Sequence, residues 1–344
     1  MTAAIVLRRR TSQPVLCCNP LPRRDAGHSL DALPHPKTYM RILIAMRAIH
    51  SLIFSALLLG GFAASSIAAT EQAAAPRIAV APQYSTTHVY VAPEDFDRFT
   101  DSLIATFGGH KSQQGVFQVT PTPSQTMSQL VFTPVGTLSV FGFKTPIPYP
   151  FGIERTGYLV TDMDAAVKSA KAHGADAVVA TFPDPIGSDA IIEWPGGVHM
   201  QLYWHTQKPQ YDPLQTVPEN RVYLSPQRAD AFVGGFVAFA HGRVVSDERK
   251  APGIEIGRAK ESYRRVRLES PFGKLAVMVT DGHLPYPFGR EVTGYEVGDL
   301  AATLRKAQAA GAAILVQPFV SDKREAAIVQ FPGGYIAEIH AAVR

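Results

Sequence analysis

Cysteine is almost absent from this sequence: only two of its 344 residues are cysteine, Cys17 and Cys18. Both lie in residues 1–39, an Arg- and Pro-rich stretch without hydrophobic periodicity, which we interpret as a disordered extension or the result of a misplaced start codon. A mature chain without this stretch has no thiol, which excludes disulfides, thiolate metal sites and cysteine nucleophiles. A protein without cysteine also suits an oxidising compartment.

The sequence also lacks an apolar run long enough to span a membrane. The run from Leu52 to Phe62 is shorter than the roughly 18–20 residues that a spanning helix needs. It follows a basic start at 40–47 and precedes small residues, among which Ser66 and Ala68 suit a signal-peptidase site. We therefore predict a signal peptide at 40–69, a flexible N-terminus at 70–83, and a periplasmic or secreted protein. A single membrane anchor is the alternative, but no cysteine follows the run to carry a lipid, so we expect no stable membrane anchor.

Long tracts of one charge are missing as well. Of the 33 basic and 29 acidic residues, eight and two lie in residues 1–69, so 25 basic and 27 acidic residues remain, a net charge of −2. The positive formal charge of the whole chain, +4, therefore comes from residues 1–69. Residues 70–344 are mildly acidic and lack the excess of positive charge that binds the phosphates of nucleic acid. We therefore expect no nucleic-acid partner.

An internal repeat organises the rest of the chain. The motif Tyr-Pro-Phe-Gly at 149–152 recurs at 286–289, and Thr-Gly-Tyr at 156–158 recurs at 293–295 with the same offset. Further matches at that offset are Asp162 with Asp299 and Pro195-Gly196-Gly197 with Pro332-Gly333-Gly334. The repeat predicts a first domain at 84–206 and a second at 218–343, joined by a Pro-containing linker at 207–217.

Each copy contains the same smaller unit twice. A β-rich stretch at 87–92 precedes apolar residues at helical spacing between Phe96 and Phe107, and Gly108-Gly109 can end that helix. Three strand-like runs follow, at 115–119, 129–132 and 137–143. The pattern restarts with a strand at 156–160 and a helix that Asp162 can cap. The chain therefore predicts an α+β fold with four units of strand, helix and three strands.

Three stretches carry a resemblance to a known family: 88–109, 156–174, and the turn and strand at 194–202. Together with the double duplication, they resemble the vicinal-oxygen-chelate superfamily, which includes glyoxalase I, extradiol dioxygenases and bleomycin-resistance proteins. The resemblance covers essentially all of 84–343. It implies tandem domains, each a pair of βαβββ modules that form an eight-stranded cupped mixed sheet with the helices outside.

The resemblance also implies where metal ligands would lie, at one position in each of four strands of a cup. In the first copy these positions hold His88, Ser139 or Phe141, Arg155 and Gln201. In the second they hold Arg221, Ala276 or Met278, Val292 and Glu338. A first-row metal wants three or more His, Asp or Glu ligands, and an arginine opposes a cation.

Two alternatives for the cofactor therefore stay open. Either no metal binds, or a divalent ion such as Fe, Mn, Ni or Zn is held by His88, Gln201 and Glu338, with His88 and Glu338 as the candidate catalytic residues. Some members of the superfamily pair half-sites across a domain or subunit interface, which would join His88 to Glu338 and leaves a homodimer open.

Strand alternation predicts which side chains point into each cup. Besides His88, Gln201 and Glu338, the residues expected to bind a ligand are Tyr90, Arg155, His199, Tyr203, Arg221, Tyr223 and His340. Polar side chains in such places indicate a ligand site. The alternative for the second cup is a buried Arg221–Glu338 ion pair that replaces a lost metal, and His88 could equally be a core histidine.

Three functions fit these features. The first is an exported protein that binds a small polar or anionic molecule, with Arg155 and Arg221 matching an anion. The second is a divalent-metal enzyme of the glyoxalase, lyase or dioxygenase kind. The third is a structural platform, which predicts apolar, filled cups. The polar side chains favour the first.

Overall fold

The computed structural model describes residues 77–343. The predicted extension at 1–39, the signal peptide at 40–69 and the first half of the flexible segment, 70–76, lie outside the described residues. No helix within 77–343 is both long enough and apolar enough to cross a membrane.

The first sheet takes its strands from residues 86–205. Its strand order is β2-β4-β5-β1-β6-β9-β8-β7, and β3 also pairs with β4, so the short strands β2 and β3 share one place in the sheet. The elements are η1 (Pro82–Tyr84), β1 (Thr86–Tyr90), η2 (Pro93–Asp95), α1 (Phe96–Phe107), β2 (His110–Lys111), β3 (Gly115–Phe117), β4 (Thr126–Thr133), β5 (Gly136–Phe143), β6 (Arg155–Leu159), α2 (Met163–Ala172), β7 (Asp176–Asp184), β8 (Gly187–Trp194) and β9 (Val198–His205).

The second sheet repeats this arrangement with residues 219–342. Its strand order is β11-β12-β13-β10-β14-β17-β16-β15. The elements are β10 (Glu219–Leu224), α3 (Pro226–Ala240), β11 (Arg243–Pro252), η3 (Gly253–Ile256), β12 (Ser262–Ser270), β13 (Gly273–Val279), β14 (Val292–Glu296), α4 (Leu300–Ala309), β15 (Ala313–Ser321), β16 (Arg324–Gln330) and β17 (Ile336–Ala342).

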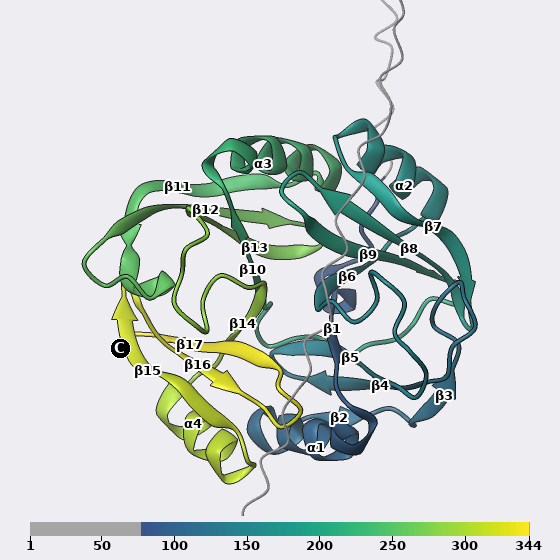
Figure 1. Cartoon of the computed structure of the whole chain (residues 1–344), viewed down its shortest axis with the longest axis horizontal. Helices are drawn as coiled ribbons and strands as arrows, with labels where there is room; N and C mark the ends of the chain where they lie inside the picture. Colours follow the sequence, from purple (N-terminus) through teal and green to yellow (C-terminus); the bar gives the residue numbers. More distant parts are fainter. Residues whose placement is uncertain (1–76, 344) are drawn as a thin grey trace, which may run out of the picture. The chain divides into compact units, whose positions relative to one another are not determined.

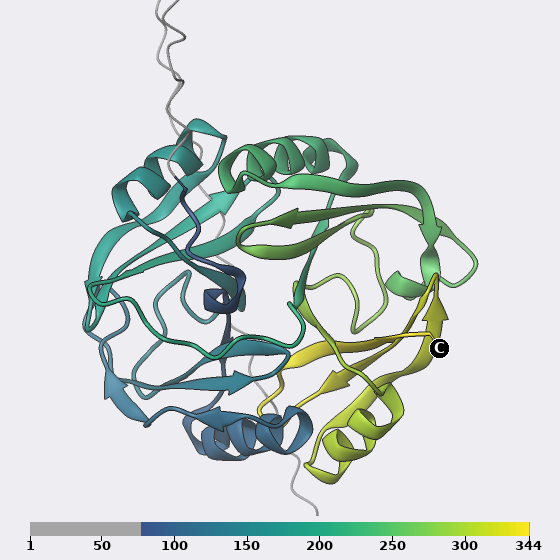
Figure 2. The same ribbon diagram turned by 180° about the vertical axis from the view of Figure 1, so that it is seen from behind.

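The predicted α+β architecture is confirmed: two tandem mixed sheets, each made of two βαβββ modules (Figures 1 and 2). In the first sheet β1 runs parallel to β5 and antiparallel to β6, which in turn runs parallel to β9. The second sheet has the same pairings between β10, β13, β14 and β17. Because every strand of a sheet comes from one copy, the half-sites of each cup are paired within a copy.

The repeated polar and glycine positions form the ends of the helices. The Asp162 carboxylate accepts a hydrogen bond from the Ala165 amide, and Asp299 does the same for Ala302, both at 2.8 Å. Each carboxylate satisfies an amide that has no partner in the helix and favours the positive helix N-terminus. Helix α1 ends at Gly108, whose φ of 80° suits glycine. These local signals explain why the helices begin and end where the sequence predicts.

Two hydrophobic cores lie between the sheets and each combines helices from both copies. Helices α2 and α3 are in contact in one core, and α1 and α4 are in contact in the other (Figure 1). In the first core Trp194 of β8 packs against Phe232 and Phe239 of α3, with ring centroids 6.3 and 5.4 Å apart. Since each helix layer buries apolar surface of both copies, neither copy has a core of its own on that side.

The shared cores predict that both copies unfold in one transition. Both tryptophans, Trp194 and Trp204, lie in strands of the first sheet, and Trp194 also packs against α3, so their fluorescence reports on the first copy and on its contact with the second. Removing the fully buried Phe232 ring of the second copy with Phe232→Ala should lower the free energy of unfolding by about 3–5 kcal/mol. In urea, the fluorescence midpoint should fall as far as the far-ultraviolet circular dichroism midpoint.

The control is Phe117→Ala, which removes an exposed ring of the first copy and should change stability by roughly 0.5 kcal/mol or less. A fluorescence midpoint that stays at the wild-type value in Phe232→Ala, while the dichroism shows a second, earlier transition, would mean that the copies fold independently.

Candidate functional site

A cavity of about 220 Å³ opens on the inner side of the first sheet, hereafter the first cup. Its walls come from β1, β3, β4, β5, β8 and β9, the segments on either side of β3, the loop before β6, the end of β7 with the β7–β8 turn, and the segment that follows β9. Aromatic and aliphatic side chains line one part, among them Phe117, Phe141 and Ile186, and polar side chains line the other. An apolar pocket with a few convergent polar groups is the usual form of a small-molecule site.

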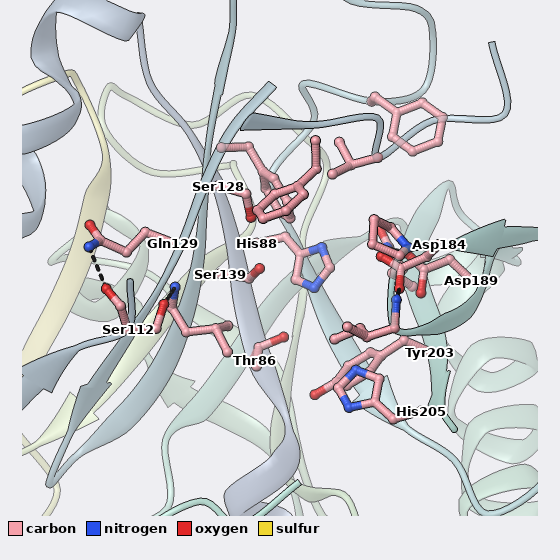
Figure 3. A pocket seen from close by; sticks show the side chains of 18 of the residues that line it. Thr86, His88, Ser112, Ser128, Gln129, Ser139, Asp184, Asp189, Tyr203 and His205 are labelled. Atoms are coloured by element: carbon pink, nitrogen blue, oxygen red, sulfur yellow. Dashed lines mark hydrogen bonds between the residues drawn. The ribbon is translucent and has the colours of Figure 1, made fainter. Parts of the chain in front are cut away.

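His88 lies in the middle of the polar part. It comes from β1, next to Ser139 of β5 and Arg155 of β6, and its side chain is almost completely buried, with 4% exposed. Figure 3 shows its ring between Ser139 on one side and Asp189 on the other. The ring atom Nδ1 has no hydrogen-bond partner within the described protein. An unpaired buried nitrogen costs about 1–3 kcal/mol, so His88 Nδ1 is a strong candidate for a ligand contact.

His88 is held in its neutral form. Burial, followed by the positive charge of Arg155, lowers its pKa to about 3, although a hydrogen bond with Gln201 raises it. At neutral pH the imidazole therefore carries one proton and one lone pair, and it can offer a hydrogen-bond acceptor without adding charge.

The glycine of the repeated Thr-Gly-Tyr motif makes room for this ring. A Cβ atom on Gly157 would lie only 2.4 Å from His88 Nε2. The corresponding Gly294 of the second copy lies against Arg221, whose Nε would be 3.4 Å from such a Cβ. The glycine therefore recurs because the first strand of each copy points a large side chain across the neighbouring strand.

Arg155 forms the base of the first cup. It is only 1% exposed, and its Nε donates to Gln201 Oε1 at 3.2 Å while one terminal nitrogen donates to the Tyr90 hydroxyl at 2.7 Å. The other terminal nitrogen donates to the carbonyls of Pro150 and Ile153, at 2.9 and 3.1 Å. The guanidinium is thus bonded to the protein and is not part of the cavity lining. It positions other side chains and does not present a free cation.

Gln201 links this arginine to a carboxyl group. Its Nε2 donates to Asp189 Oδ2 at 2.8 Å, which completes a chain from Arg155 through Gln201 to Asp189. Burial, reinforced by the charge of Asp184, raises the pKa of Asp189 well above its ordinary value, against the effects of Gln201 and Arg155. Our sequence reasoning missed Asp189, although an aspartate just before the apolar run at 190–192 was an available signal.

Of the other residues predicted for the first cup, two line the cavity and one does not. Tyr90 and Tyr203 line the cavity, and the Tyr203 hydroxyl donates to the Tyr84 carbonyl. His199 does not line it: its Nε2 lies 2.9 Å from the Glu193 carboxylate on the neighbouring strand. The ring of His199 instead meets that of the exposed Tyr149, with centroids 6.2 Å apart. His199 therefore belongs to the rim.

The inner side of the second sheet, the second cup, holds a network of charged side chains. Arg221 forms a buried ion pair with Glu338, and His340 Nδ1 lies 3.0 Å from the other Glu338 oxygen. Glu219 lies 3.3 Å from Arg221 and also accepts a hydrogen bond from Arg324 at 3.0 Å. The buried Arg221–Glu338 ion pair, one of the alternatives that the sequence left open, is therefore present.

The network continues through residues that no sequence pattern singled out. Arg265 is fully buried and pairs with Glu255, Glu248 and Asp322. Tyr223, predicted as a ligand contact, packs beside Tyr263 and Met278 in a small apolar cluster. The second cup is therefore occupied by the protein's own side chains, which pair with one another.

The residues at the metal positions do not fit a divalent ion. In the first cup His88, Ser139, Arg155 and Gln201 do come together, but Arg155 is a cation and both polar atoms of Gln201 already have partners. In the second cup Glu338 binds Arg221, and the strand neighbours of Arg221 are Ala276 and Val292. His88 and Glu338 belong to different sheets. Within residues 77–343 no group of three or more His, Cys, Asp or Glu could hold a metal ion.

Solved structures with similar folds exist. A triple mutant of 4-hydroxymandelate synthase from Streptomyces coelicolor aligns with a TM-score of 0.52 at 13% identity, over 77% of this chain and 94% of that chain. A fusion of a xylose isomerase-like TIM barrel with 4-hydroxyphenylpyruvate dioxygenase aligns with a TM-score of 0.49 at 13% identity, over 78% of this chain and half of the fusion's length. No protein-family model and no curated protein sequence matches this chain.

The synthase belongs to the vicinal-oxygen-chelate superfamily, and at this identity the similarity concerns the fold. The same fold was implied by the resemblance of the Thr-Gly-Tyr and Pro-Gly-Gly segments and by the double repeat. The fold is compatible with a divalent metal, whereas the side chains at the metal positions of this chain are not. The chain therefore has the fold of tandem vicinal-oxygen-chelate domains.

Proposed function

We propose that this chain is an exported glyoxalase-like protein that binds a small polar molecule in its first cup without the help of a metal. One observation carries the proposal: a cavity of about 220 Å³ surrounds the buried His88, whose Nδ1 lacks a partner within the described protein. A filled structural platform would not leave a polar atom unpaired beside open space. The second cup, by contrast, is filled and takes the role of a scaffold.

A neutral polar ligand fits the first cup better than an anionic one. No lysine or arginine is among the described residues that line the cavity, whereas Asp184 and Asp189 are. Arg155 and Arg221, the two cations expected to attract an anion, are bonded within the protein. A carboxylate in the cavity would lose its hydration without gaining a partner of opposite charge.

Export completes the proposal and is supported by the leader at 40–69. The apolar run, the small residues after it and the absence of cysteine from residues 40–344 favour secretion into an oxidising compartment. The ligand would then be a molecule present outside the cytoplasm.

A thermal-shift screen of small neutral and charged compounds tests the binding role. We expect neutral polar compounds to raise the midpoint of unfolding, by roughly 5 °C at a concentration near one hundred times Kd. Ser139→Leu, which adds an apolar side chain beside His88 inside the cavity, should abolish this shift. Ser262→Leu makes the same change at an exposed position of the second sheet and should keep it.

Two outcomes would contradict the proposal: no compound stabilises the protein, or the same compounds stabilise wild type and Ser139→Leu equally. Ser128→Leu fills the cavity from β4 and provides a second test if Ser139→Leu unfolds at a lower temperature.

The metal content of the purified protein tests the proposal that the first cup binds its ligand without a metal. Protein prepared without chelator or affinity tag should contain far less than about one equivalent of Fe, Mn, Ni or Zn by mass spectrometry, because His88 is the one His, Asp or Glu at the four positions of the first cup. His88→Ala and Glu338→Ala should leave the content unchanged. Near-stoichiometric metal that either substitution removes would restore the alternative of a metal-dependent lyase or dioxygenase.

A further inference from the structure

The chemistry of the first cup defines a class of ligand, and His88 is the central group. Its Nε2 lies on the side of Gly157, and Gly157 is the strand neighbour of Gln201. Gln201 Oε1 must face Arg155, because an arginine can only donate. A proton on Nε2 can therefore go to Gln201, which leaves Nδ1 as a buried acceptor without a donor.

The walls around this acceptor are aromatic. Phe141 lies beside His88, with ring centroids 5.4 Å apart, and stacks on Tyr90 at 5.3 Å. Phe151 and Phe117 complete the apolar part of the lining, Phe117 with 44% of its surface exposed. Flat rings in such positions favour a flat ligand, since offset or edge-to-face contacts add to the apolar burial.

The volume limits the size of that ligand. An engineered cavity of about 150 Å³ binds benzene, so about 220 Å³ accommodates a molecule of one or two rings. The absence of lysine and arginine among the described lining residues, together with Asp184 and Asp189, disfavours a carboxylate on it.

We infer that the first cup selects a small aromatic molecule that carries a hydrogen-bond donor, a hydroxyl or a ring N–H, and no carboxylate, with His88 Nδ1 accepting from the donor. This inference rests on the proposed function and specifies its ligand. Selectivity arises because a ligand without the donor leaves Nδ1 unpaired in a site that water can no longer reach.

Matched pairs of probes test the donor. 2-Naphthol should bind at least about tenfold more tightly than 2-methoxynaphthalene, which has the same rings and no donor, and than 2-naphthoate, which has a charge. Indole and 1-methylindole differ in the same way, because only indole has an N–H donor. Comparing the two pairs shows whether the site prefers a hydroxyl or a ring N–H. Calorimetry or ligand fluorescence with the purified protein gives the dissociation constants.

Substitution of His88 identifies the acceptor. His88→Leu should weaken 2-naphthol about tenfold and leave 2-methoxynaphthalene within about twofold, because only the hydrogen bond is lost. His88→Asn places an oxygen near the position of Nδ1 and should retain most of the affinity for 2-naphthol. His283→Leu, at an exposed position in the second copy, should change neither affinity.

The outcomes separate this inference from the proposed function. Equal binding of 2-naphthol and its methyl ether, lost in Ser139→Leu, would overturn the donor selectivity and keep the first cup as a binding site. The inference also fails, and the binding site stays, if no naphthalene or indole binds while other compounds stabilise the protein in a manner sensitive to Ser139→Leu. Loss of all stabilisation by any compound would overturn both.

Discussion

The buried guanidinium of Arg155 is the constraint on which the first cup depends. A cation removed from water needs several hydrogen-bond acceptors, and this one takes the Gln201 amide, the Tyr90 hydroxyl and two backbone carbonyls of the loop at 150–153. Each bond fixes a part of the site: the loop closes one wall, Tyr90 stacks on Phe141, and Gln201 turns toward both Asp189 and His88. A single side chain thus orders the floor of the cup, where the superfamily fold would place a metal.

Each copy buries an arginine in its cup, but the two arginines have different partners. This difference explains why the first cup has a cavity and the second is filled. In the second copy Val292 replaces Arg155, and the cation moves one strand away to Arg221, directly opposite Glu338. A carboxylate partner neutralises Arg221, and further charges from Glu219 and Arg324 fill the surrounding space. In the first copy neutral acceptors surround Arg155 and leave room above them. Buried ion pairs contribute little stability compared with apolar packing, so the second network is no evidence of a more stable second sheet.

The sequence was sufficient for the fold because the fold depends on local and periodic features. The capping residues Asp162 and Asp299, the glycines after the helices and the repeated turns all act on their own segments, and the duplication made them visible twice. The site depends on distances that no such pattern encodes. Strand alternation placed Gln201 and Tyr203 in the cup, but also His199, because it cannot show that the start of β9 lies beyond the rim. For Asp189 the sequence offers only its place before an apolar run, and its contact with Gln201 follows from the pairing of β8 with β9.

Charge read from the sequence does not show whether a cation is free to contact a ligand, and the reason is physical. An arginine near a pocket suggests an anionic ligand only if its donors are free, and whether they are free depends on carbonyls and amides that any sequence contains. Here Arg155 and Asp189 are joined through the neutral Gln201, and burial, which raises the pKa of Asp189 well above its ordinary value, disfavours the negative charge of that carboxyl. His88 is kept neutral by the same burial and the same arginine. The described residues that line the cavity thus offer no free lysine or arginine, and their unpaired buried polar atoms are His88 Nδ1, Thr86 Oγ1 and Gln129 Oε1.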